Sequence, residues 1–192
     1  MIRIGILGSI GSGKSHVAKL FGYPVFNADV EVAKLYKKNK KCYKKLKKIL
    51  PDYVKSFPIK KKNLTKSIIN NQQNLKKIIK IVHPEIRTCL KKFSKKNKNK
   101  KFIILDIPLL IENKINKKND ILVFVEAKKK DINKKLKKKY KGHLKIISKL
   151  KKFQLGVERK KNKSDFVIKN TFKHNSVKKS VKRVLNEILL NV

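Results

Sequence analysis

A short glycine-rich segment near the N-terminus constrains this chain more than any other stretch. Residues Gly8 to Ser15 read GSIGSGKS and match the pattern G-x-x-x-x-G-K-[ST] at every position. The preceding residues 1–7 are mostly apolar and predict a short buried strand, and residues 16–21 have the apolar spacing of a helix. A strand, a glycine-rich turn and a helix in this order are the context in which the pattern binds a nucleoside triphosphate.

The residue types of this segment suit the binding of phosphate groups. Gly8, Gly11 and Gly13 allow the tight bend in which successive backbone N–H groups surround a phosphate. The N-terminus of the following helix adds unpaired donors and a partial positive charge. The Lys14 ammonium can reach the outer phosphates, and the Ser15 hydroxyl can bind a magnesium ion.

Composition fits one ordinary globular domain with an unusual charge. The chain has 192 residues, of which 40% are hydrophobic, and its formal net charge is +42. Of its 54 basic residues only four are arginine, the residue that nucleic-acid readers favour at phosphates and guanines. Lys, Asn and Ile share A/T-rich codons, so we favour a biased genome over selection for DNA or RNA binding as the reason for the excess of lysine. We therefore expect non-specific binding of polyanions at low salt and no specific nucleic-acid partner.

The two cysteines and the distribution of apolar residues indicate a cytoplasmic protein. Cys42 and Cys89 belong to no disulfide or metal-binding pattern, which suits a reducing compartment. No apolar run approaches the length of a membrane span, and the apolar N-terminus lacks a signal-peptide cleavage site. We expect no membrane partner, and a monomer or a small homo-oligomer.

Further apolar runs predict a parallel sheet. Residues 102–106 and 121–126 are continuous apolar strands, and residues 23–26 and 164–168 are shorter candidates. Segments with helical spacing lie between and after them, at 30–50, 64–82, 128–141, 143–160 and 177–189. His83-Pro84 is expected to begin another helix, with proline in the first turn. Strands that alternate with helices indicate an α/β fold with a parallel sheet covered on both faces.

The chain has only 12 acidic residues, so their positions are informative. Asp29, Asp106 and Glu126 stand at or just after the carboxyl ends of predicted strands, where open α/β sheets bind their ligands. Asp106 is placed to order the magnesium shell, directly or through water. Asp29 is placed to act as a general base toward an acceptor hydroxyl, or alternatively to cap a helix that begins at Val30.

Several segments together resemble the dephospho-coenzyme A kinase family over nearly the whole chain. They are Ile4–Ser15, Asn27–Asp29, His83–Arg87, Asp106–Glu112, Gln154 and Ser164–Asn170. The resemblance implies ATP-dependent phosphorylation of the ribose 3′-hydroxyl of dephospho-CoA, the last step of coenzyme A synthesis. It implies a P-loop kinase fold of three α/β/α layers with a five-stranded parallel sheet. It also implies a core of residues 1–29, 101–134 and 161–192, a helical substrate domain at about 30–100 and a lid at about 135–160.

The resemblance also implies roles for single residues, with Asp29 as the base and Lys14 as the other catalytic group. The implied ATP-binding set is Gly8, Gly11, Ser12, Gly13, Lys14, Ser15 and His16, with Lys135 and Lys139 in the lid. The implied dephospho-CoA-binding set is His83, Pro84, Arg87, Asp106, Pro108 and Leu109, and the implied Mg²⁺ set is Ser15 and Asp106. The family usually has Asp at position 27, where Asn27 stands, and arginine at the two lid positions. Lysine keeps the positive charge there but lacks the bidentate fork.

The P-loop alone also fits other functions. One is another small-molecule kinase, such as a nucleoside monophosphate kinase, which a comparison of dephospho-CoA with AMP, CMP and shikimate as acceptors would separate. Another is a nucleic-acid-binding P-loop protein, for which the net charge of +42 is the only support. The last is a P-loop domain without turnover.

Overall fold

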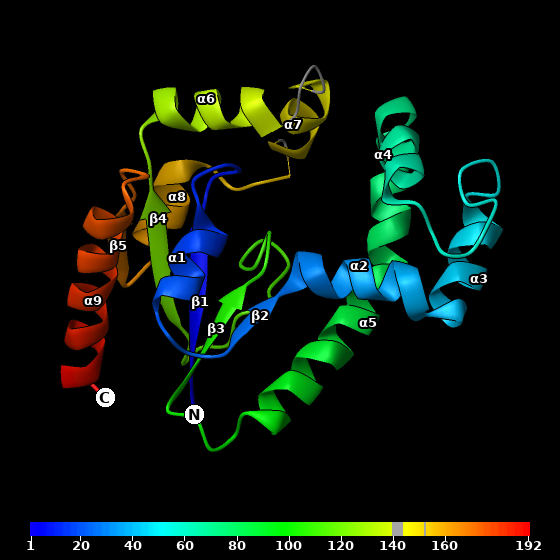
Figure 1. Ribbon diagram of the computed structural model, residues 1–192. Coiled ribbons are helices and arrows are strands. Elements are labelled where there is room, and N and C mark those ends of the chain that lie inside the picture. Colours follow the sequence, from blue (N-terminus) through cyan, green and yellow to red (C-terminus); the bar gives the residue numbers. More distant parts are fainter. Residues whose placement is uncertain (140–143, 152) are drawn as a thin grey trace. The chain divides into compact units, whose positions relative to one another are not determined.

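A computed structural model describes residues 1–139, 144–151 and 153–192 of the chain. They form two compact units, one of Met1–Asn27 with Asn97–Val192 and the other of Ala28–Lys96. The first unit contains the strands and the P-loop, and the second is entirely helical in its regular structure (Figure 1).

The first unit is built on a five-stranded parallel sheet in the order β2-β3-β1-β4-β5. The strands are β1 (Ile2–Gly8), β2 (Val25–Asn27), β3 (Phe102–Asp106), β4 (Ile121–Glu126) and β5 (Phe166–Lys169). The middle strands are apolar without alternation because both of their faces are covered, and β3 is buried at every position. The predicted α/β fold with a five-stranded parallel sheet is confirmed.

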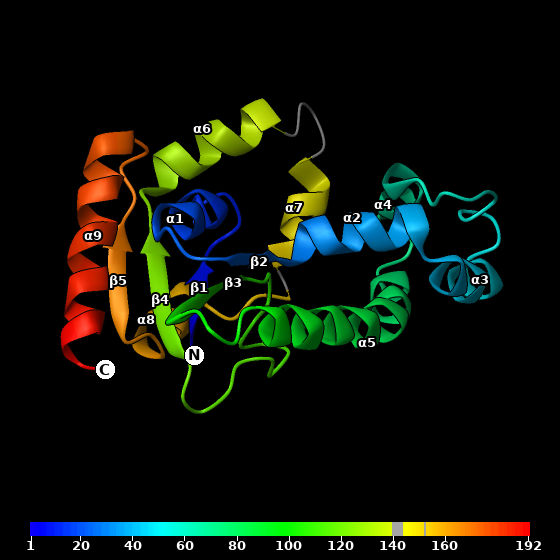
Figure 2. The same ribbon diagram turned by 60° about the horizontal axis from the view of Figure 1, so that its bottom comes forward.

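Helices lie on both faces of this sheet. α1 (Lys14–Leu20) packs against β1 and β3, and α9 (His174–Leu190) packs against β5 and α1. α8 (Val157–Asn162) contacts β1 from the face opposite α1 (Figures 1 and 2). α6 (Lys129–Lys139) and α7 (Leu144–Lys151) precede α8 in the chain.

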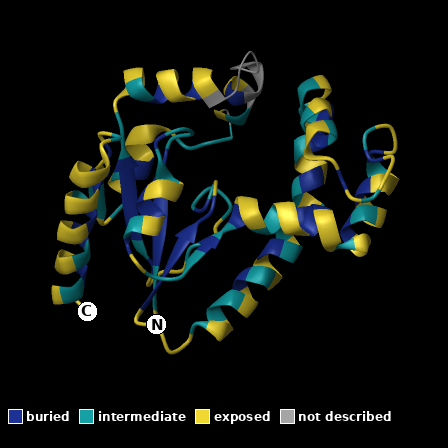
Figure 3. Ribbon diagram, in the orientation of Figure 1, coloured by how far each residue is buried: buried dark blue, intermediate teal, exposed yellow. Residues whose placement is uncertain are grey.

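α9 shows how a lysine-rich helix contributes to the core. Its buried residues form one stripe along the helix, Val177, Val181, Val184 and Ile188. Burying each such side chain contributes roughly 1.5–3 kcal/mol. The lysines between them are exposed, so the outer face of α9 is yellow in Figure 3 while the strands are dark blue. The charge of the helix therefore stays in solvent.

The second unit consists of α2 (Ala28–Lys38), α3 (Lys40–Ile49), α4 (Lys61–Asn70) and α5 (Gln73–Lys96). α5 contacts each of the other three, and its buried apolar residues form a stripe of Ile78, Val82, Ile86 and Leu90. The helix predicted at 30–50 is divided at Asn39, whose side chain accepts a hydrogen bond from the Cys42 N–H at 2.8 Å. Asn39 is thus the N-cap of α3, a role that asparagine favours.

The expectation that His83-Pro84 begins a helix is wrong. Both residues lie inside α5, where Pro84 cannot donate to the carbonyl one turn earlier. An interior proline costs a helix about 3 kcal/mol. The helix continues because its buried stripe passes through this point, with Val82 and Ile86 on the two sides of the proline. Burial of the whole stripe outweighs the local cost.

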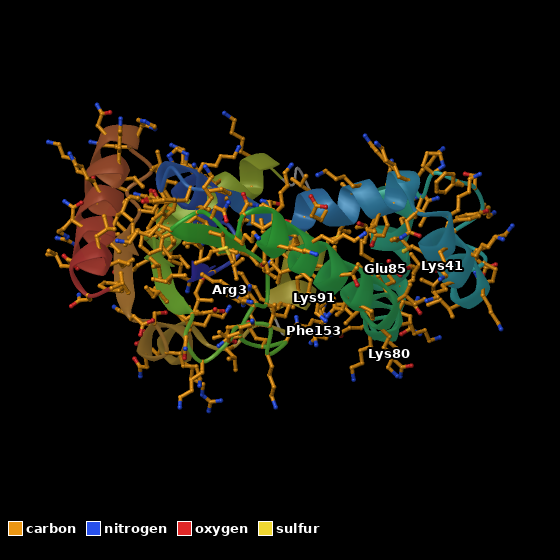
Figure 4. All side chains as sticks on the ribbon, turned by 90° about the horizontal axis from the view of Figure 1, so that it is seen from below. Arg3, Lys41, Lys80, Glu85, Lys91 and Phe153 are labelled. Atoms are coloured by element: carbon orange, nitrogen blue, oxygen red, sulfur yellow. The ribbon has the colours of Figure 1, made fainter. Side chains whose placement is uncertain are left out.

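Lysine side chains surround both units at their surfaces (Figure 4). In the helical unit Lys41, Lys80 and Lys91 are exposed, whereas Glu85 is half-buried. The Glu85 carboxylate accepts a hydrogen bond from the side-chain amide of Asn39 at 3.3 Å. Among the described residues, no helix combines the length and the apolar character that a membrane crossing requires.

Buried ion pairs connect loops of the first unit to a strand and a helix, since Arg3 lies in β1 and Lys160 in α8. The Arg3 guanidinium lies 2.6 Å from the Asp120 carboxylate, and Lys160 Nζ lies 2.9 Å from Glu112 Oε1. Glu112 Oε1 also accepts a hydrogen bond from the Leu155 N–H at 3.0 Å. One carboxylate in the loop after β3 therefore fixes both α8 and the segment that leads into it.

Glu112→Gln should lower the free energy of unfolding by about 3 kcal/mol, because it leaves the buried Lys160 ammonium without its charge partner. Urea denaturation measures this loss. Glu126→Gln is the matched control, since its pair with Lys161 has side chains 35% and 39% exposed, and there we expect a loss below about 1 kcal/mol. Adding Lys160→Met to Glu112→Gln should recover most of the stability. A double variant as unstable as Glu112→Gln would contradict this account.

Candidate functional site

The candidate site lies at the carboxyl edge of the sheet. Because all five strands are parallel, their carboxyl ends and the loops that follow them share this edge. β1 lies between β3 and β4, so the chain leaves β1 at the point where the strand order reverses. Open α/β sheets bind their ligands in the crevice at such a point. The P-loop is the segment that follows β1 there.

The P-loop has the backbone of a phosphate cradle. The φ angles of Gly8, Gly11 and Gly13 are 146°, 85° and 89°, in the region that glycine adopts without steric cost. The Ser12 N–H donates to the Ser9 carbonyl at 3.1 Å and closes the turn. Successive left-handed and right-handed residues direct backbone N–H groups into one concavity, which binds anions.

α6 packs directly on the P-loop. A Cβ atom added to Gly11 would lie 2.9 Å from a methyl carbon of Leu136 and 3.2 Å from one of Ile132, so a larger residue there would force these side chains of α6 to shift. The same helix carries Lys135, whose ammonium lies 4.0 Å from the centroid of the Phe172 ring in a cation–π contact. The unit that contains the P-loop therefore also contains the Lys135 ammonium, which the Phe172 ring holds in position. Lys139 ends α6, and its side chain lies outside the described residues.

The polar side chains of the P-loop differ in exposure. Lys14 Nζ donates to the carbonyl oxygens of Gly8 at 3.1 Å and Ser9 at 2.9 Å, which holds the ammonium over its own loop. Ser15 is exposed in the first turn of α1, whereas Ser12 is 1% exposed. Within the described part of the chain, Ser12 Oγ has no hydrogen-bond partner. An ammonium and an exposed hydroxyl thus accompany the backbone donors, which is the set that a phosphate–magnesium complex requires.

His16 is the residue after this run. Its ring centroid lies 5.6 Å from that of His174, at the start of α9. Partial desolvation, followed by the positive charges of His174, Lys135 and Lys19, lowers the pKa of His16. At neutral pH the imidazole is therefore uncharged, and it offers a flat surface rather than another cation.

Asn27 and Asp106 meet at the ends of β2 and β3. The sheet register pairs the two residues, and Asn27 Nδ2 donates to Asp106 Oδ2 at 2.6 Å. Asp106 is 4% exposed. A hydrogen-bond donor at this distance stabilises the ionised carboxylate. The result is a buried carboxylate at the binding edge of the sheet, and carboxylate oxygen is a ligand that Mg²⁺ prefers.

The loop after β3 contains the other residues predicted from Asp-Ile-Pro-Leu-Leu. Pro108 is exposed and Leu109 is half-buried. Leu109 has a φ of 58°, and its carbonyl accepts a hydrogen bond from the Asn113 N–H at 3.0 Å. A left-handed conformation costs a bulky residue roughly 1–2 kcal/mol, and such strain is concentrated at ligand-binding sites.

Four predicted site residues belong to the helical unit. Asp29 is exposed in the first turn of α2, which begins at Ala28, so the alternative that Asp29 caps a helix from Val30 is wrong. His83, Pro84 and Arg87 lie on α5.

Of the three residues on α5, Pro84 and Arg87 are exposed, and His83 is half-buried. Burial, followed by the charge of Arg87, lowers the pKa of His83, so its imidazole is neutral at pH 7. A neutral imidazole can donate one hydrogen bond and accept another.

Two residues with no predicted role lie against the P-loop or its helix. Asn170 donates from Nδ2 to the Ser12 carbonyl at 2.7 Å, and Phe172 supports Lys135. Asn170 ends the last segment of the family resemblance, which was the only sequence signal that could have identified it. The described residues contain no group of three His, Cys, Asp or Glu side chains that could hold a metal ion on their own.

Comparison with known proteins gives a consistent result. The family profile for Dephospho-CoA kinase matches residues 2–176. A protein named Dephospho-CoA kinase from Wolbachia pipientis wMel is 33% identical over 195 residues, which cover 98% of each chain. A Thermus thermophilus crystal structure matches with a TM-score of 0.76 and 28% identity over 97% of both chains. A dephospho-CoA kinase structure from Campylobacter jejuni has a TM-score of 0.64 at 24% identity, over 97% of this chain and 96% of that one, and supports the fold alone.

Asn27→Asp should lower the free energy of unfolding by roughly 1–3 kcal/mol at neutral pH, because two carboxylates then lie in contact. The native state would bind a proton more tightly than the unfolded chain, so the loss grows as the pH rises and shrinks as it falls toward about 4. Added Mg²⁺ should also reduce the loss if the cation binds at this edge.

Urea unfolding at several pH values, with EDTA or Mg²⁺, measures these effects. Asn27→Ala adds no charge and serves as the control; it removes only the donor to Asp106, so its loss should grow with pH much less steeply than that of Asn27→Asp. A loss in Asn27→Asp that is equal at every pH would mean that the side chains at positions 27 and 106 do not meet.

Proposed function

This chain belongs to the dephospho-CoA kinase family, and we propose that it transfers the γ-phosphoryl group of ATP to the 3′-hydroxyl of dephospho-CoA. This transfer is the last phosphorylation of coenzyme A synthesis. The family match over residues 2–176 is the observation that carries this proposal. The geometry of the P-loop at the carboxyl edge of the sheet supports the assignment of ATP to that loop.

The first unit binds the phosphoryl donor in this proposal. The backbone N–H groups of Gly11 to His16 surround the β- and γ-phosphates, and the Lys14 ammonium leaves its contacts with Gly8 and Ser9 to neutralise them. The Ser15 hydroxyl and the Asp106 carboxylate supply oxygen ligands to Mg²⁺, directly or through water. Bound Mg²⁺ neutralises charge on the phosphates. Lys135 and Lys139 add positive charge from the lid.

The residues proposed to bind the acceptor dephospho-CoA come from α5 of the helical unit and, in the first unit, from the loop after β3. Arg87 is an exposed guanidinium suited to a phosphate oxygen of dephospho-CoA. His83 and Pro84 lie within one turn of Arg87 on α5, and Pro108 and Leu109 contribute from the loop after β3. Asp29 follows β2 by two residues and is exposed, so its carboxylate is available to a substrate hydroxyl.

Asp29 acts as the general base. Its carboxylate accepts the proton of the 3′-hydroxyl while the 3′-oxygen bonds to the γ-phosphorus and the bond from that phosphorus to the β,γ-bridging oxygen breaks. ADP leaves with the electron pair of the broken bond. The protein otherwise contributes alignment and positive charge, which supply most of the catalysis in phosphoryl transfer.

The chain acts in the cytoplasm in this proposal, as a monomer or a small homo-oligomer. Cys42 and Cys89 are both free thiols, which fits a reducing compartment. The positive surface binds nucleic acid only without specificity, in a manner that salt reverses.

The purified chain with Mg-ATP should phosphorylate dephospho-CoA much faster than AMP, CMP or shikimate, and the product should be coenzyme A. Lys14→Ala should abolish transfer while circular dichroism shows an intact fold, because the charge that grows on the phosphates loses its neutralising group. A preference for AMP or CMP would support a nucleoside monophosphate kinase instead. ATP turnover that polynucleotide stimulates would support a nucleic-acid function.

Asp29→Asn should lower kcat by roughly 10² to 10⁴-fold and leave stability and ATP affinity near wild type, since the amide keeps the shape but cannot take the proton. Single-turnover transfer to dephospho-CoA and thermal melting measure the two effects. Glu31→Gln is the control on the same helix, with a carboxylate that pairs with Lys34 at 2.7 Å, and its kcat should be unchanged. A normal kcat in folded Asp29→Asn would mean that the base lies elsewhere.

A further inference from the structure

Asn170 is a buried polar residue to which the chemistry above assigns no role. It follows β5 directly and is 3% exposed. Its backbone N–H donates to the carbonyl of Glu126, the last residue of β4, at 2.7 Å. This bond anchors the backbone of Asn170 at the carboxyl edge of the sheet. Buried side-chain amides whose hydrogen bonds are satisfied hold their neighbours in one arrangement.

The nitrogen end of the Asn170 side chain binds the P-loop. Nδ2 donates to the Ser12 carbonyl oxygen at 2.7 Å, and Ser12 is itself 1% exposed. A Cβ atom added to Gly13 would overlap with Asn170 Nδ2. Glycine at this position is therefore required by the contact as well as by the φ angle of 89°.

This bond determines the direction of the peptide unit between Ser12 and Gly13. In a trans peptide the carbonyl oxygen and the following N–H point to opposite sides. A Ser12 carbonyl that faces Asn170 therefore directs the Gly13 N–H away from Asn170. Because Gly13 has no side chain, rotation of this peptide meets little steric resistance. The hydrogen bond from Asn170 to the Ser12 carbonyl opposes such a rotation.

The oxygen end of the same amide holds a second functional segment. Oδ1 accepts a hydrogen bond from the Phe172 N–H at 2.8 Å, and Phe172 has a left-handed φ of 62°. The Phe172 ring in turn lies 4.0 Å from the Lys135 ammonium. Since the amide group is planar and rigid, one side chain fixes both the P-loop peptide and the turn that supports the lid cation.

We propose that Asn170 is a positioning residue for ATP binding, which orients the Gly13 N–H toward the phosphates and holds Phe172 beneath Lys135. The inference rests on the proposed function in one respect, that the P-loop binds ATP. This role of Asn170 differs from a purely structural one because the orientation of the Gly13 N–H changes the affinity for ATP directly.

Two substitutions separate the two ends of the amide. Asn170→Asp removes the donor to Ser12 and keeps the acceptor for Phe172, whereas Asn170→Ala removes both. Titration calorimetry with Mg-ATP and no acceptor measures affinity, and urea unfolding measures stability. At a pH of about 8, Asn170→Asp should bind ATP at least roughly tenfold more weakly than wild type, and Asn170→Ala at least as weakly as Asn170→Asp.

The pH dependence of the affinity is the decisive measurement. In Asn170→Asp the introduced carboxyl regains a donor when it is protonated, and its buried position favours the protonated form. The affinity of Asn170→Asp should therefore approach that of wild type as the pH falls to about 5.5. The ratio of Asn170→Ala to wild type should stay constant, because alanine has no group to titrate. Because protonation also removes a negative charge that would repel ATP, the pH series is read together with a neutral variant. If Asn170→Ala does not fold, Asn170→Ser, whose side chain is too short to reach the Ser12 carbonyl, takes its place.

Asn74 offers a matched control in the helical unit. It is 6% exposed, and its Nδ2 donates to the Ser67 carbonyl at 3.1 Å, so the chemical contact is of the same kind. Asn74→Asp should lose stability and keep the ATP affinity of wild type. If both Asn170 variants also lost stability but kept the ATP affinity of wild type at every pH, the inference would be overturned.

The outcomes for the inference and for the proposed function are distinguishable. Because ATP binding is measured without an acceptor, a chain that binds ATP but does not phosphorylate dephospho-CoA would overturn the proposed function alone. A wild-type chain that does not bind ATP would overturn both.

Discussion

Parallel pairing of β1 on both of its edges is the constraint on which the site depends. Ile4 pairs with Ile104 of β3 on one side and with Ile121 of β4 on the other, and Ile4 and Ile6 have no exposed surface. A slip of one residue would turn each of these side chains to the opposite face. The end of β1 is therefore fixed in register relative to its neighbours, and the P-loop begins its bend from this paired strand. The glycines supply the bend, but the sheet determines where it begins.

A net charge of +42 destabilises the folded state through repulsion among like charges. The positions of the charged side chains reduce this repulsion. Lysines occupy the solvent faces of helices such as α9, where water and salt screen their repulsion. The buried basic side chains of Arg3 and Lys160 form ion pairs with the carboxylates of Asp120 and Glu112. The remaining positive field has a use in the proposed reaction, because ATP and dephospho-CoA are both anions and the field raises their local concentration.

The spacing of apolar residues along the sequence predicted those strands whose formation depends mainly on their own residues. The apolar runs 102–106 and 121–126 correspond to β3 and β4 in full, since a short continuous apolar run between helices suits a covered strand. The helix start predicted at Pro84 was wrong because burial of the stripe on α5 overrides a proline, and burial is a tertiary effect. The P-loop was evident from its motif, but the contact between Asn170 and Ser12 spans 158 residues. No spacing rule encodes a contact of that kind, which only the assembled sheet creates.

Lysine in place of arginine changes how a cation must be held. A guanidinium is oriented by its planar fork, whereas an ammonium on a flexible chain takes its position from its surroundings. At Lys135 the face of Phe172, 4.0 Å from the ammonium, provides that position. Phe172 is held by Asn170, and Asn170 by the carbonyl of Ser12 in the P-loop. A sequence with few arginines can thus hold a lysine ammonium against an aromatic ring, here through a ring whose backbone is hydrogen-bonded to Asn170 and so linked to the P-loop.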